Sequence, residues 1–83
     1  MTITGKVQGV FFRSNARKKA LELKIRGYAK NLENGQVEIV AQGNDDKLKD
    51  FVKFLKSGPG YANVYDMRIK HKDLEYIRDF KII

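Results

Sequence analysis

Residues 32–43, LENGQVEIVAQG, predict a β-hairpin turn and the strand that follows it. Asn34-Gly35 is a strong hairpin signal, because both residues tolerate the positive φ that a tight turn needs. The apolar residues after the turn occupy every second position, the pattern of a half-buried strand: Val37, Ile39 and Ala41. We therefore expect an antiparallel pair of strands joined at this turn in the middle of the chain.

On the N-terminal side of the turn, the segment KIRGYAKN, residues 24–31, predicts the first strand of the hairpin. Before it, an apolar stripe at i, i+4, i+8 and i+11 predicts a helix: Phe12, Ala16, Ala20 and Leu23. Residues 1–7, MTITGKV, alternate weakly and favour a strand. Because only four residues precede Gly5, we expect this strand to be short.

On the C-terminal side, Asn44 is a good N-cap for a second helix, with two acids in its first turn, Asp45 and Asp46. Apolar residues then repeat at i, i+3, i+4 and i+7 up to a Gly58-Pro59 stop: Leu48, Phe51, Val52 and Leu55. Two more strands are expected beyond it, separated by a polar loop around residues 72–75. The first is marked by Tyr65, Met67 and Ile69, and the short last one by Phe80 and Ile82.

The element order is β-α-β-β-α-β with a short terminal strand. At 83 residues this order predicts one domain, a two-layer ferredoxin-like α+β sandwich with an antiparallel sheet and both helices on one face. The first strand is expected to be central in the sheet, and the crossovers right-handed. The same layout serves RNA-binding modules, metal chaperones and enzymes, so the fold does not decide the function.

The composition removes several kinds of active site. The chain has no Cys, which excludes thiolate catalysis, disulfides and Cys-based metal sites. Its one histidine, His71, has no nucleophile paired with it in the sequence and is expected at the surface. Asp45 and Asp46 are explained by helix capping rather than by a catalytic pair. No cluster of His and Asp has the spacing of metal ligands.

The charge favours an anionic partner. The formal net charge is +7, and it is concentrated in residues 1–43, which hold eight Lys or Arg and three acids, against nine and seven in residues 44–83. Nucleic acid and small phosphorylated molecules both fit such a field, as does a merely solvated lysine-rich surface. No apolar run is long enough to span a bilayer and the N-terminus lacks a signal-peptide core, so we expect a cytoplasmic protein.

The segment GKVQGVFFR, residues 5–13, can be interpreted as an anion site. A glycine-punctuated turn that runs into a helix can point several backbone N–H groups at one spot. Arg13 falls in the first helical turn, where a cation is mildly unfavourable for the helix dipole, so local stability does not explain it. A guanidinium beside such N–H groups suits a phosphate. The alternative is an ordinary strand–helix turn with an incidental surface arginine.

Asn31, at the end of the predicted strand before the hairpin, is the second candidate. Asn near a turn is usually structural. Its amide both donates and accepts hydrogen bonds, so it could instead hold a water molecule.

These segments resemble the signatures of the acylphosphatase family. GKVQGVFFR is similar to the pattern G-x-V-Q-G-V-x-F-R at every specified position. GYAKNLENGQVEIVAQG, residues 27–43, resembles the second signature, and GPGYANV, residues 58–64, resembles a Gly-Pro…Ala-x-Val segment after the second helix. The resemblance covers nearly the whole chain, so residues 1–83 are expected to form a single acylphosphatase-like domain. Family members usually carry several more residues before the first signature.

The resemblance implies hydrolysis of the carboxyl–phosphate bond of small acyl phosphates to a carboxylate and inorganic phosphate, without metal or cofactor. Arg13 would bind the phosphate, and Asn31 would orient the attacking water. The resemblance also implies a phosphate loop that binds through backbone N–H groups: Gln8, Gly9, Val10, Phe11 and Phe12. We expect a monomer inhibited by its product, inorganic phosphate, with no nucleic-acid or membrane partner.

Two alternatives remain. One is an acylphosphatase-like domain with a binding or carbamoyl-phosphate-handling role, as in much larger hydrogenase-maturing carbamoyltransferases. The other is an RNA-binding ferredoxin-like module, which the basic charge and the stretch RGYAKN favour. Lys30 and Leu32 stand where that module needs aromatic rings, which disfavours the second alternative.

Overall fold

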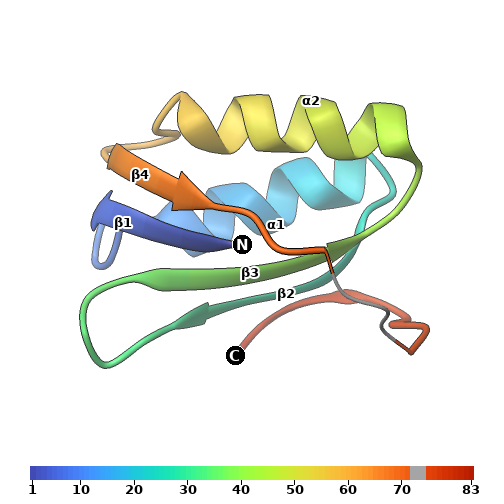
Figure 1. The fold of residues 1–83 in the computed structure, drawn as a ribbon, viewed down its shortest axis with the longest axis horizontal. Helices are drawn as coiled ribbons and strands as arrows, with labels where there is room; N and C mark the ends of the chain where they lie inside the picture. Colours follow the sequence, from blue (N-terminus) through green and yellow to red (C-terminus); the bar gives the residue numbers. More distant parts are fainter. Residues whose placement is uncertain (72–74) are drawn as a thin grey trace.

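The protein is a two-layer α+β sandwich, described here by a computed structural model for residues 1–71 and 75–83. Figure 1 shows both helices on the same face of one twisted sheet. The elements follow the predicted order: β1 (Thr2–Lys6), α1 (Phe12–Glu22), β2 (Arg26–Asn31), β3 (Val37–Gln42), α2 (Asp45–Lys56), β4 (Asn63–Arg68) and β5 (Phe80–Ile82).

The five strands lie in the order β4-β1-β3-β2-β5. β1 is an inner strand, because it pairs antiparallel with β3 on one side and with β4 on the other. The central place among the five strands belongs to β3, not to β1 as expected. β1 is also short, although Met1 donates to and accepts from the backbone of Ile39 and so extends the pairing by one residue. One strand departs from the expected antiparallel sheet, since β5 runs parallel to β2.

The predicted hairpin joins β2 and β3, but its turn differs in detail. Leu32 and Gln36 form the last backbone pair, with Leu32 N–H donating to the Gln36 oxygen at 2.8 Å, so three residues lie in the loop. Gly35 alone takes a positive φ, of 90°, whereas Asn34 does not. Asn34 instead accepts from the Gln36 N–H at 3.0 Å through its side chain. This is a type I turn closed by a left-handed glycine rather than a two-residue turn.

The strand predicted from residue 24 begins at Arg26 because the end of α1 takes up the residues before it. Lys24 has a left-handed φ of 57°, and the Ile25 N–H reaches back to the Ala20 oxygen at 2.8 Å. This bond, from an N–H to the carbonyl oxygen five residues earlier, together with the left-handed residue before it, is a Schellman motif, which ends many helices.

The strand predicted around Tyr65, Met67 and Ile69 is present as β4, although Ile69 lies just past its end and its alternation is interrupted. The register with β1 shifts between Thr4 and Gly5, which leaves Tyr65 as an extra residue on β4. A bulge of this kind turns the side chains after it relative to those before it. Tyr65 is 71% exposed and Ile69 is 45% exposed, whereas Val64 and Met67 pack against the core.

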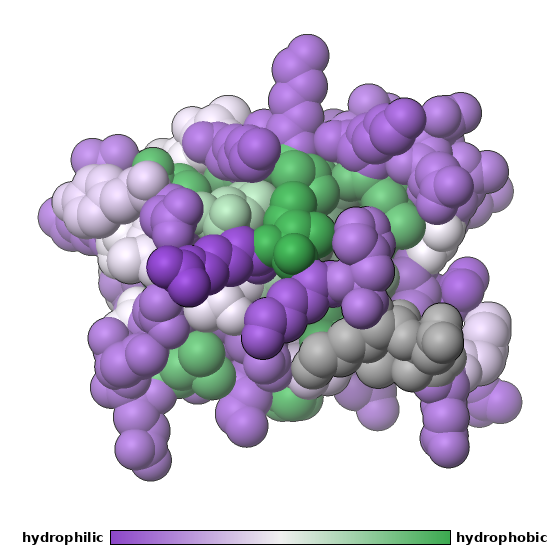
Figure 2. All heavy atoms as spheres, in the orientation of Figure 1, coloured by the Kyte–Doolittle hydropathy of each residue, from purple (hydrophilic) through white to green (hydrophobic). Residues whose placement is uncertain are grey.

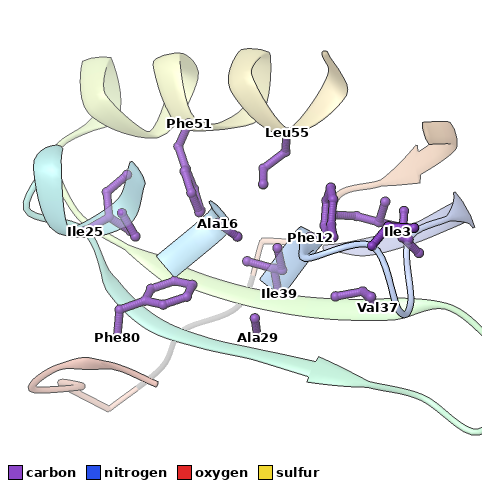
Figure 3. Close-up of a cluster of buried hydrophobic side chains, with 13 residues drawn as sticks. Ile3, Phe12, Ala16, Ile25, Ala29, Val37, Ile39, Phe51, Leu55 and Phe80 are labelled. Atoms are coloured by element: carbon purple, nitrogen blue, oxygen red, sulfur yellow. The ribbon is translucent and has the colours of Figure 1, made fainter. Parts of the chain in front are cut away.

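The core lies between the helices and the sheet. Figure 3 shows Phe51 and Leu55 of α2 directed at Ala16 of α1 and at Ile39 of β3. Phe12, Ala16 and Ala20 are fully buried, as their stripe predicts, and Leu23 packs at its margin. Phe51 meets Phe80 of β5 edge to face with ring centroids 5.9 Å apart. The short last strand is thus held by packing as well as by pairing.

α2 begins as predicted, with the Asn44 side chain accepting from the Asp46 N–H at 3.0 Å. Around the helices the surface is mainly hydrophilic, and hydrophobic atoms reach it below α2 (Figure 2). Among the described residues, neither helix is long and apolar enough to cross a membrane. His71 is exposed, as expected, and most of the predicted polar loop at 72–75 lies outside the described residues.

Candidate active site

The loop between β1 and α1 has a backbone suited to anion binding. Gly9 has a φ of 72°, and Phe11, the residue before the helix, has φ 62° and ψ 21°. Backbone that includes left-handed residues turns successive N–H groups toward one concave side. Glycine takes this conformation freely, but a residue with a side chain does so at a cost of about 1 kcal/mol.

The two helices differ at their N-termini. α2 has a capping Asn44 and two acids in its first turn, whereas α1 has no side-chain cap and no acid there. The first N–H groups of a helix need acceptors, and the helix dipole adds a partial positive charge at that end. In α1 that positive end is joined by Arg13, the second helical residue, so the loop and the helix together favour an anion.

Asn15 holds the left-handed Phe11 in place. Its backbone N–H and its side-chain Nδ2 both donate to the Phe11 carbonyl oxygen, at 3.0 and 2.9 Å. The sequence prediction did not include this residue. Asn is a poor helix former, and its occurrence in the first turn of α1 is a weak signal of such side-chain bonding to the backbone.

Gln8 ties this loop to the β2–β3 hairpin. Its Nε2 donates to the backbone oxygens of Leu32 and Gln36, at 2.8 and 2.9 Å. The side chain of Gln8 is therefore used structurally, which leaves its backbone N–H for the predicted phosphate loop. Because Leu32 follows Asn31, the bond also places the loop next to the end of β2.

Arg13 is placed near β2 by a second link. Its Nη1 donates to the Ile83 oxygen at 3.3 Å, and the Ile83 N–H donates to the Ala29 oxygen at 2.9 Å. Ala29 and Asn31 are two residues apart on β2. Because side chains along a strand alternate between the two faces of the sheet, both lie on the face that the helices cover. Two separate hydrogen-bond links thus bring the predicted residues Arg13 and Asn31 to the same end of the molecule.

Asn31 has a buried polar atom without a partner. Its Oδ1 is inaccessible to solvent and accepts no hydrogen bond from any described residue. An unpaired buried acceptor is unfavourable, and in native proteins such atoms are commonly satisfied by a water molecule or used in function.

The segment of residues 58–62, between α2 and β4, closes the loop on its other side. Gly60 packs so tightly here that a Cβ on it would lie 3.1 Å from the Val10 oxygen and 2.9 Å from Asn15 Nδ2. Figure 1 shows this segment, the β1–α1 loop and the β2–β3 hairpin at one end of the molecule. All three motifs that the sequence singled out therefore meet there.

Other chemical groups lie elsewhere. In residues 1–71 and 75–83, no group of three His, Asp or Glu side chains could hold a metal ion. Two surface hollows follow β5, and neither includes Arg13 or Asn31 among its lining residues. Because neither hollow contains a residue that the sequence singled out for chemistry, we place the candidate site at the loops. Tyr28 is the described group with a clearly shifted pKa, raised by burial and by its bond to Glu38, and it lies on β2 away from this loop.

Comparison with known proteins decides the family. The sequence model of the acylphosphatase family matches residues 1–82. The chain belongs to the acylphosphatase family. A curated acylphosphatase of Coxiella burnetii is 43% identical over 82 residues, which span 99% of this chain and 86% of that one.

Solved structures agree with the acylphosphatase assignment. The crystal structure of acylphosphatase from Bacillus subtilis has a TM-score of 0.94 and 35% identity, and the match covers 99% of this chain and 92% of that one. HypF from T. kodakarensis has a TM-score of 0.84 and 28% identity, and the match covers all of this chain but 12% of HypF. The ferredoxin-like fold is thereby confirmed, and it also occurs as a small part of a much longer protein.

Proposed function

We propose that this acylphosphatase-family chain hydrolyses small acyl phosphates to a carboxylate and inorganic phosphate. One observation carries the proposal: the uncapped N-terminus of α1 is entered through left-handed Gly9 and Phe11, with Arg13 in its first turn. A dianionic phosphoryl group, with three terminal oxygens, is the ligand that this set of donors fits best.

The phosphate is held by the backbone N–H groups of residues 8–12 and by the Arg13 guanidinium. Among the described residues Arg13 donates one side-chain hydrogen bond, to the Ile83 oxygen at 3.3 Å, so most of its donors are available to substrate. In phosphoryl transfer the negative charge spreads over the equatorial phosphate oxygens, and fixed donors aimed at them stabilise the transition state. The Asn15 and Gln8 bonds keep the loop in this conformation before substrate binds.

Asn31 orients the attacking water through its side-chain amide, which can both donate and accept hydrogen bonds. Its place at the end of β2, which the Gln8 bonds to the hairpin hold beside the loop, supports this role. The water oxygen then forms a bond to phosphorus as the bond from phosphorus to the carboxyl oxygen breaks. The carboxylate leaves with the electron pair of that bond. One water proton passes to a phosphate oxygen of the substrate, and the other stays on the attacking oxygen, which becomes a hydroxyl of the product phosphate. No side-chain base is needed, because a carboxylate is already a good leaving group.

The non-hydrolytic alternative is kept because the fold also forms part of HypF. A domain in such a setting would bind a phosphorylated ligand without turning it over. The RNA-binding alternative is weakened by Tyr28, whose hydroxyl donates to Glu38 at 3.0 Å on the sheet face where a base would stack.

Hydrolysis of benzoyl phosphate by the purified protein, with inorganic phosphate as a competitor, distinguishes these functions. We expect turnover and competitive inhibition. Phosphate binding without turnover would support the non-hydrolytic role, whereas tight oligonucleotide binding that phosphate does not displace would support the RNA-binding module. We further propose that residues 1–83 act as one monomeric domain in the cytoplasm, with no nucleic-acid or membrane partner.

A further inference from the structure

Two large aromatic side chains are exposed beside the proposed phosphate loop. Phe11 is 68% exposed and Tyr61 is 80% exposed. Single exposed aromatic residues are common on protein surfaces and need no explanation by themselves. These two differ in where they lie, one within the β1–α1 loop and the other in the segment that closes it.

Folding stability does not explain the side chain at position 11. Phe11 takes a left-handed backbone conformation, which glycine would adopt without strain. With 68% of its surface exposed, Phe11 gains little from packing in return. Position 11 is also one of the two that the family pattern G-x-V-Q-G-V-x-F-R leaves unspecified, so the phosphate loop itself does not demand an aromatic residue there.

Tyr61 is brought to the same place by Gly60. A Cβ on Gly60 would lie 3.1 Å from the carbonyl oxygen of Val10, the residue before Phe11. Tyr61 follows Gly60 and Phe11 follows Val10, so each is the next residue along the chain from this contact. Consecutive Cα atoms are about 3.8 Å apart, so both residues lie beside the contact. The ring of each residue is then within reach of a ligand held at the loop.

The strand order places Tyr61 on the side of the loop opposite Asn31. The loop follows β1, Asn31 ends β2, and Tyr61 precedes β4, in a sheet whose order is β4-β1-β3-β2-β5. In Figure 1 the β1–α1 loop lies between the hairpin after β2 and the segment before β4. In phosphoryl transfer the attacking and leaving oxygens are roughly in line through phosphorus. A water at Asn31 therefore directs the leaving acyl group toward the segment that carries Tyr61.

We propose that Phe11 and Tyr61 bind the acyl group of the substrate and make the enzyme prefer acyl phosphates with aromatic or extended apolar acyl groups. This inference rests on the proposed hydrolysis at the Arg13 site. Rings on the acyl side remove apolar substrate surface from water, and an offset or edge-to-face ring contact adds to that. A compact acyl group such as acetyl is too small to use them.

The experiment compares kcat/KM for benzoyl phosphate and acetyl phosphate, two substrates that share the bond being broken. The variants are Tyr61→Ala and Phe11→Asn, since Asn tolerates the left-handed conformation and keeps the backbone N–H. We expect the benzoyl-to-acetyl ratio of kcat/KM to fall about three- to tenfold in each variant, the size of one aromatic contact. Tyr65→Ala is the matched control, because Tyr65 is equally exposed but lies on the outer strand, and its ratio should equal that of the wild type.

An unchanged ratio in both variants, with turnover retained, overturns the acyl-binding role and leaves the proposed function standing. A fall of the same size in Tyr65→Ala overturns it too, because the effect would then not be local. If the wild type hydrolyses neither substrate, the proposed function fails and takes this inference with it. Inhibition by inorganic phosphate, which has no acyl group, should be the same in Tyr61→Ala as in the wild type.

Discussion

Asn15 donates two hydrogen bonds to the carbonyl oxygen of Phe11, from its backbone N–H at 3.0 Å and from Nδ2 at 2.9 Å. The backbone bond belongs to any helix, but the side-chain bond is specific to this residue. It anchors the strained residue at the junction of loop and helix, and so couples the first turn of α1 to the shape of the proposed phosphate loop.

Replacing Asn15 with alanine should loosen this loop. We expect the free energy of unfolding to fall by about 1 kcal/mol, the typical net contribution of one hydrogen bond. We also expect a higher inhibition constant for inorganic phosphate and a higher KM, because Phe11 is then free to leave the left-handed region. Chemical denaturation and phosphate inhibition measure the two effects.

A second substitution tests whether Asn15 acts by holding Phe11 in its left-handed conformation or only by stabilising the fold. Phe11→Gly in the Asn15→Ala background should restore phosphate inhibition, since glycine adopts the left-handed conformation unaided. Ser14→Ala, at an exposed neighbouring position, is the control and should leave inhibition unchanged. If inhibition by phosphate stays weak in the double variant, Asn15 does not act by holding Phe11 in place.

Replacing Arg13 with alanine should remove most of the activity while the fold persists. The loss expected for one donor to a developing charge is about 10²–10³ in kcat/KM. Within the part of the chain that the structure describes, the Arg13 side chain has one hydrogen bond, at the surface, to the Ile83 oxygen, so circular dichroism should be unchanged. Lys18→Ala removes the same charge from an exposed position on the same helix and should keep nearly full activity. Similar losses in both variants would show that the effect is net charge alone.

The elements of the fold were predictable because local signals marked them. Apolar periodicity located both helices, and Asn44 and Gly58-Pro59 marked the ends of α2. The departures come from contacts between distant residues. The bulge at Tyr65 depends on pairing with β1, and the parallel β5 depends on the packing of Phe80 against Phe51. Neither leaves a trace in the local pattern.

The candidate site was predictable in its residues but not in its supports. Arg13 was conspicuous because a cation is out of place at a helix start, and Asn31 because of the signature around it. The left-handed Phe11 has no local signal, since a phenylalanine is among the last residues expected at positive φ. The Gln8 bonds to the hairpin join residues 24 and 28 positions apart, which only the folded chain brings together.

Replacing Asn31 with alanine should separate binding from turnover. We expect kcat to fall about 10²–10³ while inorganic phosphate still inhibits, because the donors to phosphate are elsewhere. Stability should change little, since the Oδ1 that is removed has no partner among the described residues. Thermal unfolding and phosphate inhibition supply the two controls. Near-normal benzoyl phosphate turnover in this variant would remove Asn31 from the mechanism.

Tyr28 predicts how stability changes in alkali. Burial, and then the hydrogen bond and charge of Glu38, raise the pKa of Tyr28 above the ordinary tyrosine value of 10.0. The folded state therefore holds the phenol proton more tightly than the unfolded chain does. This contribution is fully present below pH 10.0 and is lost as pH rises through the higher folded pKa.

Tyr28→Phe tests this by removing the titrating group. At neutral pH we expect the variant to be less stable by about 1 kcal/mol, for the lost bond to Glu38. Above pH 10 the difference in unfolding free energy between the wild type and the variant should narrow, because only the wild type loses the stability that the protonated Tyr28 contributes. Glu38→Gln should retain part of the alkaline loss, since burial is the larger cause of the raised pKa. Denaturation curves for the wild type and Tyr28→Phe that stay parallel from pH 7 to pH 11 would show that Tyr28 titrates alike in both states.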